Sequence, residues 1–251
     1  MSHTAIVEKL RADIAVIERR SLAARPVALG LPAVDACLPR GGLARGAVHE
    51  VRGTAASGFA TFVAGRVAGA VLWCVDASTR ASLYGPGFAA FGLDPARLIV
   101  VRCPNRTDML WVMEEGLRSP GLGAVIGEPE GHVDLIASRR LQLAAETGGV
   151  LGLVLARGTG RQQHFAPSAL ESRWQVDSLP APARHRAKPC WRVALSRCRG
   201  IPQRENTYWT VERDESTGHF TVADAFAGRP ADPRTGPFAA GQPAVAAGHY
   251  V

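Results

Sequence analysis

The chain has 251 residues, of which 47% are hydrophobic and 20% are charged, and this composition fits one globular domain with small appendages. It contains no run of about 18 apolar residues. It also lacks a signal-peptide pattern, so we expect a cytoplasmic protein with no membrane partner. The five cysteines are scattered and show no C-x-x-C spacing. We therefore expect reduced packing cysteines and no metal site.

A net charge of +7 permits an acidic partner such as nucleic acid. Arginine dominates this charge, because Lys9 and Lys188 are the only lysines among 29 basic residues. A composition bias toward Arg, Ala, Gly and Pro produces the same excess, so the charge supports DNA binding only weakly. The scarcity of lysine is more informative, since neither lysine lies in a glycine-rich loop.

The first predicted element is an amphipathic helix over residues 4–22, within an N-terminal arm that we place at 1–26. The helix ends before Pro26. Its apolar side chains share a helical spacing and are Ile6, Leu10, Ile14 and Ile17. Such an arm either packs on the core of its own domain or docks on another subunit.

Residues 27–157 are predicted to form an α/β core in which strands alternate with helices. The expected strands are 48–51, 71–75, 98–101, 123–126 and 150–155, and the expected helices are 57–70, 88–91, 107–117 and 133–146. This order predicts a mostly parallel sheet covered on both faces. In such a sheet, ligands bind at the carboxyl ends of the strands.

After residue 157 the composition shifts toward Pro, Arg, Gln and Ser, and we expect a connector over 158–189. Three closely spaced strands at 191–195, 207–211 and 219–222 predict an antiparallel meander, which belongs to the same domain over 190–227.

The last stretch, 228–251, contains four prolines and no hydrophobic periodicity, so we expect a disordered tail. It carries scattered hydrophobic residues, among them Phe238, Tyr250 and Val251. The tail is therefore either a second docking site or an inert extension.

One loop has the outline of a phosphate-binding loop without the residues that bind phosphate. Four residues separate its two glycines between a predicted strand and a predicted helix, as in the pattern G-x-x-x-x-G-K-[ST]. Phe59 occupies the position of the lysine, and Ala60 that of the magnesium-binding hydroxyl. A ring and a methyl group can neither neutralise phosphate charge nor ligate a metal. The residues of this degenerate loop are Gly53, Ser57, Gly58, Phe59 and Ala60.

Three consecutive segments resemble the run that leads into the P-loop of RecA recombinases. They are Leu29–Asp35, Leu38–Leu43 and Gly46–Val51. The following strands and helices continue in RecA order, so the resemblance implies a RecA-like fold with antiparallel strands near its C-terminus.

Within that fold the chain is most similar to the ImuA family of RecA-like accessory proteins. The similar segments are Gly127-Glu128, residues 134–146 and Trp191-Arg192-Val193, and the resemblance covers about residues 1–225.

The same resemblance implies that further catalytic positions of RecA are lost. RecA carries its water-activating glutamate two residues after the position of Asp76, where this chain has Ser78. At the Walker B position, Glu128 retains at most a role in holding magnesium through water. A polar pair that senses the γ-phosphate is replaced by Ala156 and Arg157. We expect no catalytic residues, no ATP hydrolysis and no cofactor, although amides at a helix start still attract anions.

A basic segment around one tryptophan is a candidate for binding single-stranded DNA. In such grooves arginines follow the phosphates and aromatic rings stack on bases. The alternative is that Trp191 is a core residue and the arginines form a solvated face. Arg157 and Arg161 are added because RecA carries a DNA-contacting loop in that region. The candidates are Arg157, Arg161, Arg184, Arg186, Lys188, Trp191, Arg192, Arg197, Arg199 and Arg204.

Three other positions are expected to have structural roles. Trp73 and Trp111 lie in apolar surroundings and are predicted to be core residues. His49 follows Val48 in the first strand of the core, and we expect a hydrogen-bonded core or edge histidine.

The resemblance implies a nucleoid-associated accessory protein of SOS-induced translesion DNA synthesis. Its partners would be an ImuB-like polymerase-family protein and an error-prone DnaE-type polymerase, together with single-stranded DNA and RecA itself. A RecA-like domain retains surfaces for DNA and for neighbouring proteins when its ATP site is lost. Two alternatives stay open, a cell-division inhibitor of the SulA type and a DNA-dependent ATPase of the RecA type.

Overall fold

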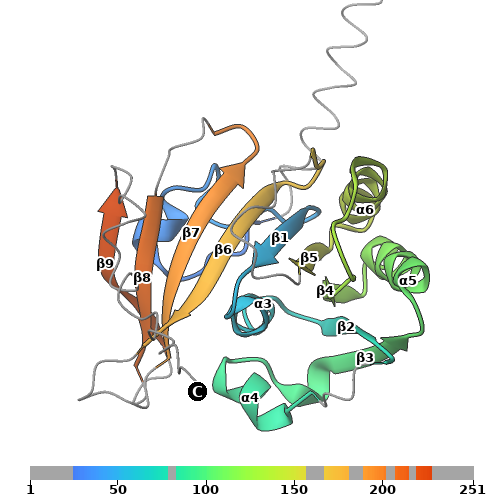
Figure 1. The fold of residues 1–251 in the computed structure, drawn as a ribbon, viewed down its shortest axis with the longest axis horizontal. Coiled ribbons are helices and arrows are strands. Elements are labelled where there is room, and N and C mark those ends of the chain that lie inside the picture. Colours follow the sequence, from blue (N-terminus) through green and yellow to red (C-terminus); the bar gives the residue numbers. More distant parts are fainter. Residues whose placement is uncertain are drawn as a thin grey trace, which may run out of the picture.

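A nine-stranded sheet organises the part of the chain that the computed structural model describes, which comprises residues 25–78, 83–156, 167–180, 189–201, 207–214 and 219–227. The strand order is β3-β2-β4-β5-β1-β6-β7-β8-β9 (Figure 1). Strands β1 to β6 run parallel to one another, and the pairs β6–β7, β7–β8 and β8–β9 are antiparallel. The expected α/β class, with antiparallel strands toward the C-terminus, is confirmed.

The elements alternate as expected up to β5. The strands are β1 (Val48–Arg52), β2 (Ala70–Asp76), β3 (Leu98–Cys103), β4 (Leu122–Gly127), β5 (Leu151–Ala156), β6 (Ser172–Leu179), β7 (Cys190–Cys198), β8 (Thr207–Arg213) and β9 (Phe220–Ala227). The helices are α2 (Pro32–Asp35), α3 (Ala56–Ala64), α4 (Gly85–Ala90), η1 (Pro95–Arg97), α5 (Arg106–Arg118) and α6 (Leu135–Gly148). The predicted N-terminal helix and the predicted disordered tail lie outside the described residues.

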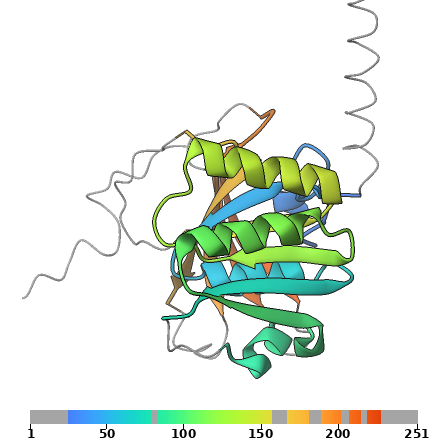
Figure 2. The ribbon, with the colours of Figure 1, turned by 90° about the vertical axis from the view of Figure 1, so that its right-hand side faces the viewer.

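Helices cover both faces of the parallel strands, as Figures 1 and 2 show. Helices α5 and α6 pack on one face, and α3 packs on the other. The central strands are buried on both sides, which explains their nearly continuous apolar sequences. Among the described residues, no helix is long and apolar enough to cross a membrane.

Side-chain caps set where two helices begin. Helix α5 starts after Asn105, whose side chain accepts a hydrogen bond from the Asp108 N–H at 2.9 Å. Helix α6 starts after Asp134, which accepts from the Ala137 N–H at 2.8 Å. Helix α3 is shorter than expected and ends at Ala64 rather than near residue 70. A tight stretch with two glycines, Gly65 and Gly69, then leads into β2.

Strand β6 corrects the prediction that residues 158–189 form only a connector. It contains Ser172–Leu179 and pairs with β1 on one side and β7 on the other. Trp174 and Val176 face the core, whereas the residues between them are polar. This alternation over a short stretch was masked by the Arg, Gln and Ser content of the surrounding sequence.

The two tryptophans that were predicted to be core residues differ in burial. Trp73 is 1% exposed, which confirms the prediction, but Trp111 is 59% exposed, and there the prediction is wrong. The buried side of α5 consists of Met109, Met113 and Leu117, at steps of four residues. Trp111 is two residues from this stripe and therefore points to solvent.

Because Trp73 is buried and Trp111 is exposed, truncation of the two side chains should affect stability differently. Trp73→Ala should lower the free energy of unfolding by about 3–5 kcal/mol, because it leaves a large cavity in the core. Trp111→Ala should change it by less than about 1 kcal/mol, because the indole is mostly solvated. Urea unfolding followed by circular dichroism measures both values. Equal losses in the two variants would contradict this assignment of core and surface.

Candidate functional site at the Gly53–Ala60 loop

The Gly53–Ala60 loop follows the carboxyl end of β1 and leads into α3. Gly53 has a φ of +102°, a conformation that L side chains rarely adopt. A Cβ at this position would lie 2.2 Å from the carbonyl oxygen of Val176 on β6. The glycine therefore allows the backbone of β6 to lie directly against the loop.

Strand β6 also binds the polar groups of the loop. The Thr54 N–H donates to Asp177 Oδ1 at 3.1 Å, and the Ala55 N–H donates to the Val176 carbonyl at 3.0 Å. In return, the Ser178 N–H donates to Thr54 Oγ1 at 2.8 Å. In phosphate-binding loops, successive amides form a nest for an anion. Here the anion that accepts from Thr54 is a carboxylate of the same chain.

Phe59, at the lysine position of the motif, is part of the hydrophobic core. Its side chain is 1% exposed, and its ring centroid lies 5.8 Å from that of Trp174 and 6.5 Å from that of Trp191. Ala60 is fully buried as well. Both positions that would handle phosphate and metal in a P-loop therefore pack α3 against the sheet.

The other positions compared with RecA also have internal partners. The backbone N–H and the hydroxyl of Ser78 both donate to Asp76 Oδ1 at 2.7 Å. Glu128 accepts a hydrogen bond from Trp73 Nε1 at 3.1 Å. Within the described ranges, no group of three or more His, Cys, Asp or Glu side chains is arranged to hold a metal ion.

The structure describes four of the ten candidate DNA-binding residues. Arg192 is exposed on β7, with its guanidinium 5.1 Å from the ring centroid of Tyr208. Arg199 is exposed just beyond the same strand. Arg197 is half-buried, and its Nη1 donates to the Ser168 carbonyl at 3.0 Å, so it has a structural role. Outside the described residues lie Arg157, Arg161, Arg184, Arg186, Lys188 and Arg204.

Trp191, the fourth described candidate, is 4% exposed and packs in the core. Its ring stacks on Phe220 with centroids 4.5 Å apart and lies 5.3 Å from Phe91. A base could not stack on it without displacing these rings. The candidate role of Trp191 in stacking on DNA is therefore wrong for this structure, and the core alternative is correct.

A buried charge cluster next to the loop was missed from the sequence. Glu50 is 4% exposed, and its carboxylate accepts from Arg173 Nε at 2.6 Å and from Arg52 Nε at 2.5 Å. These three side chains together carry one positive charge. Arg52 also pairs with Ala156, the last residue of β5, after which the candidates Arg157 and Arg161 follow. The sequence places Glu50 in a predicted core strand, and a buried carboxylate requires a partner. This residue was therefore the signal from which the charge cluster could be expected.

His49 is a satisfied core histidine, as predicted. It is 1% exposed, its Nδ1 lies 2.7 Å from Ser172 Oγ, and its Nε2 lies 3.0 Å from the Ala44 carbonyl. Burial lowers the pKa of His49 from 6.5 to about 4, because the charged imidazolium loses hydration. The histidine therefore joins β1 to β6 in its neutral form.

The order of the strands and the loop between β1 and α3 define a RecA-like α/β fold, in which Phe59 and Ala60 occupy the lysine and hydroxyl positions of the motif. A KaiC-like protein from the archaeon Pyrococcus horikoshii OT3 has a similar solved structure, with a TM-score of 0.54 over 80% of this chain and 100% of that one. The two sequences are 14% identical, so the likeness shows the fold alone. No family model matches the chain.

Two relatives identify the family. Protein ImuA of Caulobacter vibrioides, strain NA1000 / CB15N, is 37% identical over 198 residues, covering 69% of this chain and 79% of its own length. Protein ImuA of the strain ATCC 19089 / CIP 103742 / CB 15 matches with the same values. The chain belongs to the ImuA family, which confirms the resemblance seen in the sequence.

The environment of Phe59 predicts that restoring the lysine of the motif is destabilising. Phe59→Lys places an ammonium group next to Trp174 and Trp191, and should lower the free energy of unfolding by about 3–5 kcal/mol. Phe59→Leu, which keeps an apolar side chain, should lower it by about 1–2 kcal/mol. Chemical denaturation measures both variants. A lysine variant as stable as the leucine variant would show that position 59 is not a core position.

The pKa of His49 predicts a dependence of stability on pH. The folded pKa of about 4 lies below the unfolded value of 6.5, so the unfolded chain binds more protons between these values. Above pH 6.5 the histidine is neutral in both states and does not lower stability. As the pH falls from 6.5 toward 4, protonation of the unfolded chain lowers the free energy of unfolding by about 3 kcal/mol in total. His49→Gln should flatten this part of the curve of unfolding free energy against pH. An unchanged slope in the variant would assign the dependence to other groups.

Proposed function

We propose that the chain is a non-hydrolysing RecA-like accessory protein of SOS-induced translesion DNA synthesis, acting by contacts with proteins and single-stranded DNA. The observation that carries this proposal is the use of the Gly53–Ala60 loop for internal packing. Membership of the ImuA family supports the accessory role.

Phosphoryl transfer depends on positioning of the phosphates and on neutralisation of their charge. A loop that performs it needs free amides and a cation. In this chain the amides of Thr54 and Ala55 already donate to β6, and the side chain at the lysine position is a buried ring. A nucleotide would therefore have to displace internal hydrogen bonds and would still lack a lysine.

DNA contact is supported by the distribution of arginines around the sheet. Arg192 and Arg199 are exposed on and beside β7. The cluster of Arg52, Arg173 and Glu50 carries one further formal positive charge, although it is largely buried between β1 and β6. Arg192 lies opposite Asp177 near the end of β6, and Arg199 lies beside Glu171 before its start, so the two arginines mark the two ends of this strand pair. Exposed arginines attract the phosphate backbone without reading its sequence. We propose single-stranded DNA as the nucleic acid partner.

The protein partners that we propose are an ImuB-like polymerase-family protein and an error-prone DnaE-type polymerase, with RecA as a further partner. A RecA-like domain without turnover can remain bound to such partners throughout synthesis. The exposed Trp111 on α5 and the exposed Ile136 on α6 are apolar surface residues that a partner could cover.

The decisive experiment is co-purification of the chain with an ImuB-like protein and a DnaE-type polymerase, with and without single-stranded DNA. We expect a complex with the polymerase-family protein, and salt-dependent DNA binding by the chain. Combined Arg192→Glu and Arg199→Glu should lower the slope of log affinity against log salt by about 1 per lost phosphate contact. Arg139→Glu, on the exposed side of α6, is the control for each single variant, Arg192→Glu or Arg199→Glu, because it changes the net charge equally, and it should leave the slope unchanged.

The outcomes separate the proposal from its alternatives. Failure of both co-purification and DNA binding would refute it, and filamentation of cells on overexpression would then favour a division inhibitor. DNA-stimulated ATP turnover would refute the non-hydrolysing role. An unchanged salt slope in the double arginine variant would remove β7 from the DNA-binding surface.

A further inference from the structure

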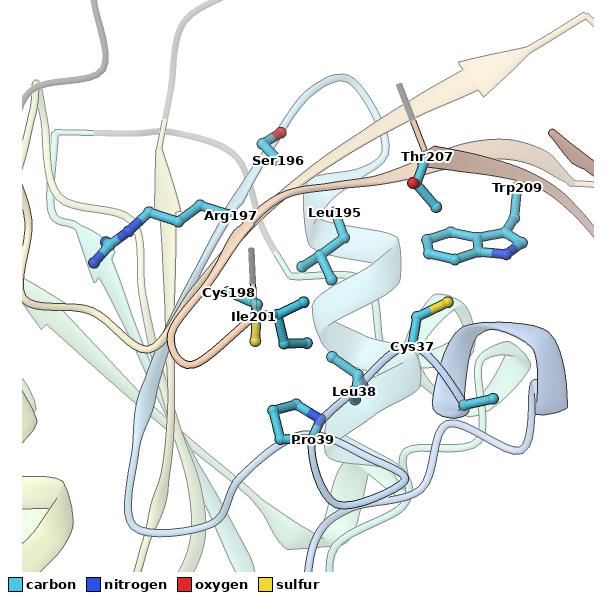
Figure 3. Close-up of a pocket in the computed structure, with 11 residues that line it drawn as sticks. Cys37, Leu38, Pro39, Leu195, Ser196, Arg197, Cys198, Ile201, Thr207 and Trp209 are labelled. Carbon is cyan, nitrogen blue, oxygen red and sulfur yellow. The ribbon is translucent and has the colours of Figure 1, made fainter. Parts of the chain in front are cut away.

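An apolar groove of about 280 Å³ lies between the segment that follows α2 and the adjoining ends of β7 and β8. Leu38 and Pro39 line one side, and Leu195, Ile201 and Trp209 line the other. Figure 3 shows the side chains of Leu38, Leu195 and Ile201 turned toward one another, whereas that of Arg197 extends away. The groove is thus suited to an apolar side chain and offers it no charged partner.

The end of β9 lies at the rim of this groove. Its last residue, Ala227, pairs with Thr207 of β8, and Thr207 lines the groove. The chain therefore leaves the described structure next to the groove, with residues 228–251 still to follow.

The sequence after Ala227 contains a suitable side chain. Phe238 and Tyr250 are the two aromatic residues of the 228–251 segment, and Phe238 directly follows Pro237. Eleven extended residues span up to about 36 Å, so Phe238 can reach the groove even along a bent path. Prolines restrict the free segment and so reduce the entropy that is lost when it becomes ordered.

The N-terminal segment is a poorer match to the groove. Its apolar residues from Ile6 to Ile17 recur over eleven positions, which in a helix extend for about 16 Å. A stripe of this length needs a long groove, whereas the cavity accepts one or two side chains. A single aromatic anchor next to a proline fits the dimensions better.

We propose that the groove binds the 228–251 segment of the same chain, with Phe238 as the side chain that fills it. This inference does not depend on the proposed role in DNA synthesis. The groove is then a docking site for an aromatic peptide segment. The 228–251 segment of the same chain occupies it, and a partner with a similar segment would compete for it.

Native cysteines report on the groove in the full-length chain. Cys37 lines the groove and is half-buried, whereas Cys74 and Cys103 are buried in the core elsewhere and serve as internal references. The experiment measures alkylation of each cysteine by N-ethylmaleimide with peptide mass spectrometry. Phe238→Ala should accelerate labelling of Cys37 on the order of tenfold, because a buried aromatic anchor is lost. Tyr250→Ala is the matched control and should not.

A substitution in the groove tests the same contact from the other side. Ile201→Arg should accelerate labelling of Cys37 as much as Phe238→Ala does, and the double variant should show no further increase. If the two substitutions accelerate labelling of Cys37 independently, so that their factors multiply in the double variant, the proposed contact between Phe238 and the groove is wrong.

Other outcomes overturn the proposal in distinguishable ways. Labelling of Cys37 that Phe238→Ala leaves unchanged would remove the tail from the groove. Protection that rises with protein concentration would assign the groove to a second copy. Faster labelling in Leu10→Ala alone would assign it to the N-terminal segment. An equal increase in the labelling of Cys103 would show that the variant unfolds as a whole, and not that the tail alone is released.

Discussion

The contact between the Gly53–Ala60 loop and strand β6 is the constraint on which the rest of the structure depends. Strand β6 is parallel to β1 and antiparallel to β7, so it joins the two halves of the sheet. Its Val176 and Asp177 accept hydrogen bonds from the loop amides. A phosphate at this loop would compete with these two acceptors for the backbone amides of Thr54 and Ala55.

Phe59 extends the hydrophobic core across this junction. Phe59 lies near Trp174 of β6 and Trp191 of β7, and Trp191 in turn stacks on Phe220 of β9. Aromatic side chains bury more area than other residues and dominate the energetics of a core. A lysine at position 59 would interrupt this cluster with a charge.

With the loop used for packing, the sites available to partners lie on other surfaces. The exposed arginines on and beside β7, the exposed apolar residues of α5 and α6, and the groove beside α2 lie on elements that pack on one sheet. A sheet with a continuous core holds such regions at fixed distances.

The sequence by itself determined the α/β class, the order of strands and helices from Val48 to Ala156, and the degenerate loop, because each depends on local periodicity and spacing. It also indicated the ImuA family. Only the tertiary structure decided that Ser172–Leu179 is a strand, that Trp191 is buried while Trp111 is exposed, and that Asp177 binds the loop. The pairing of β6 with β1 and the bond from Thr54 to Asp177 join residues more than 100 positions apart, and local sequence patterns carry no record of such partners. The exposure of Trp111 follows from its place off the buried stripe of α5, which becomes known only once the buried side of that helix is known.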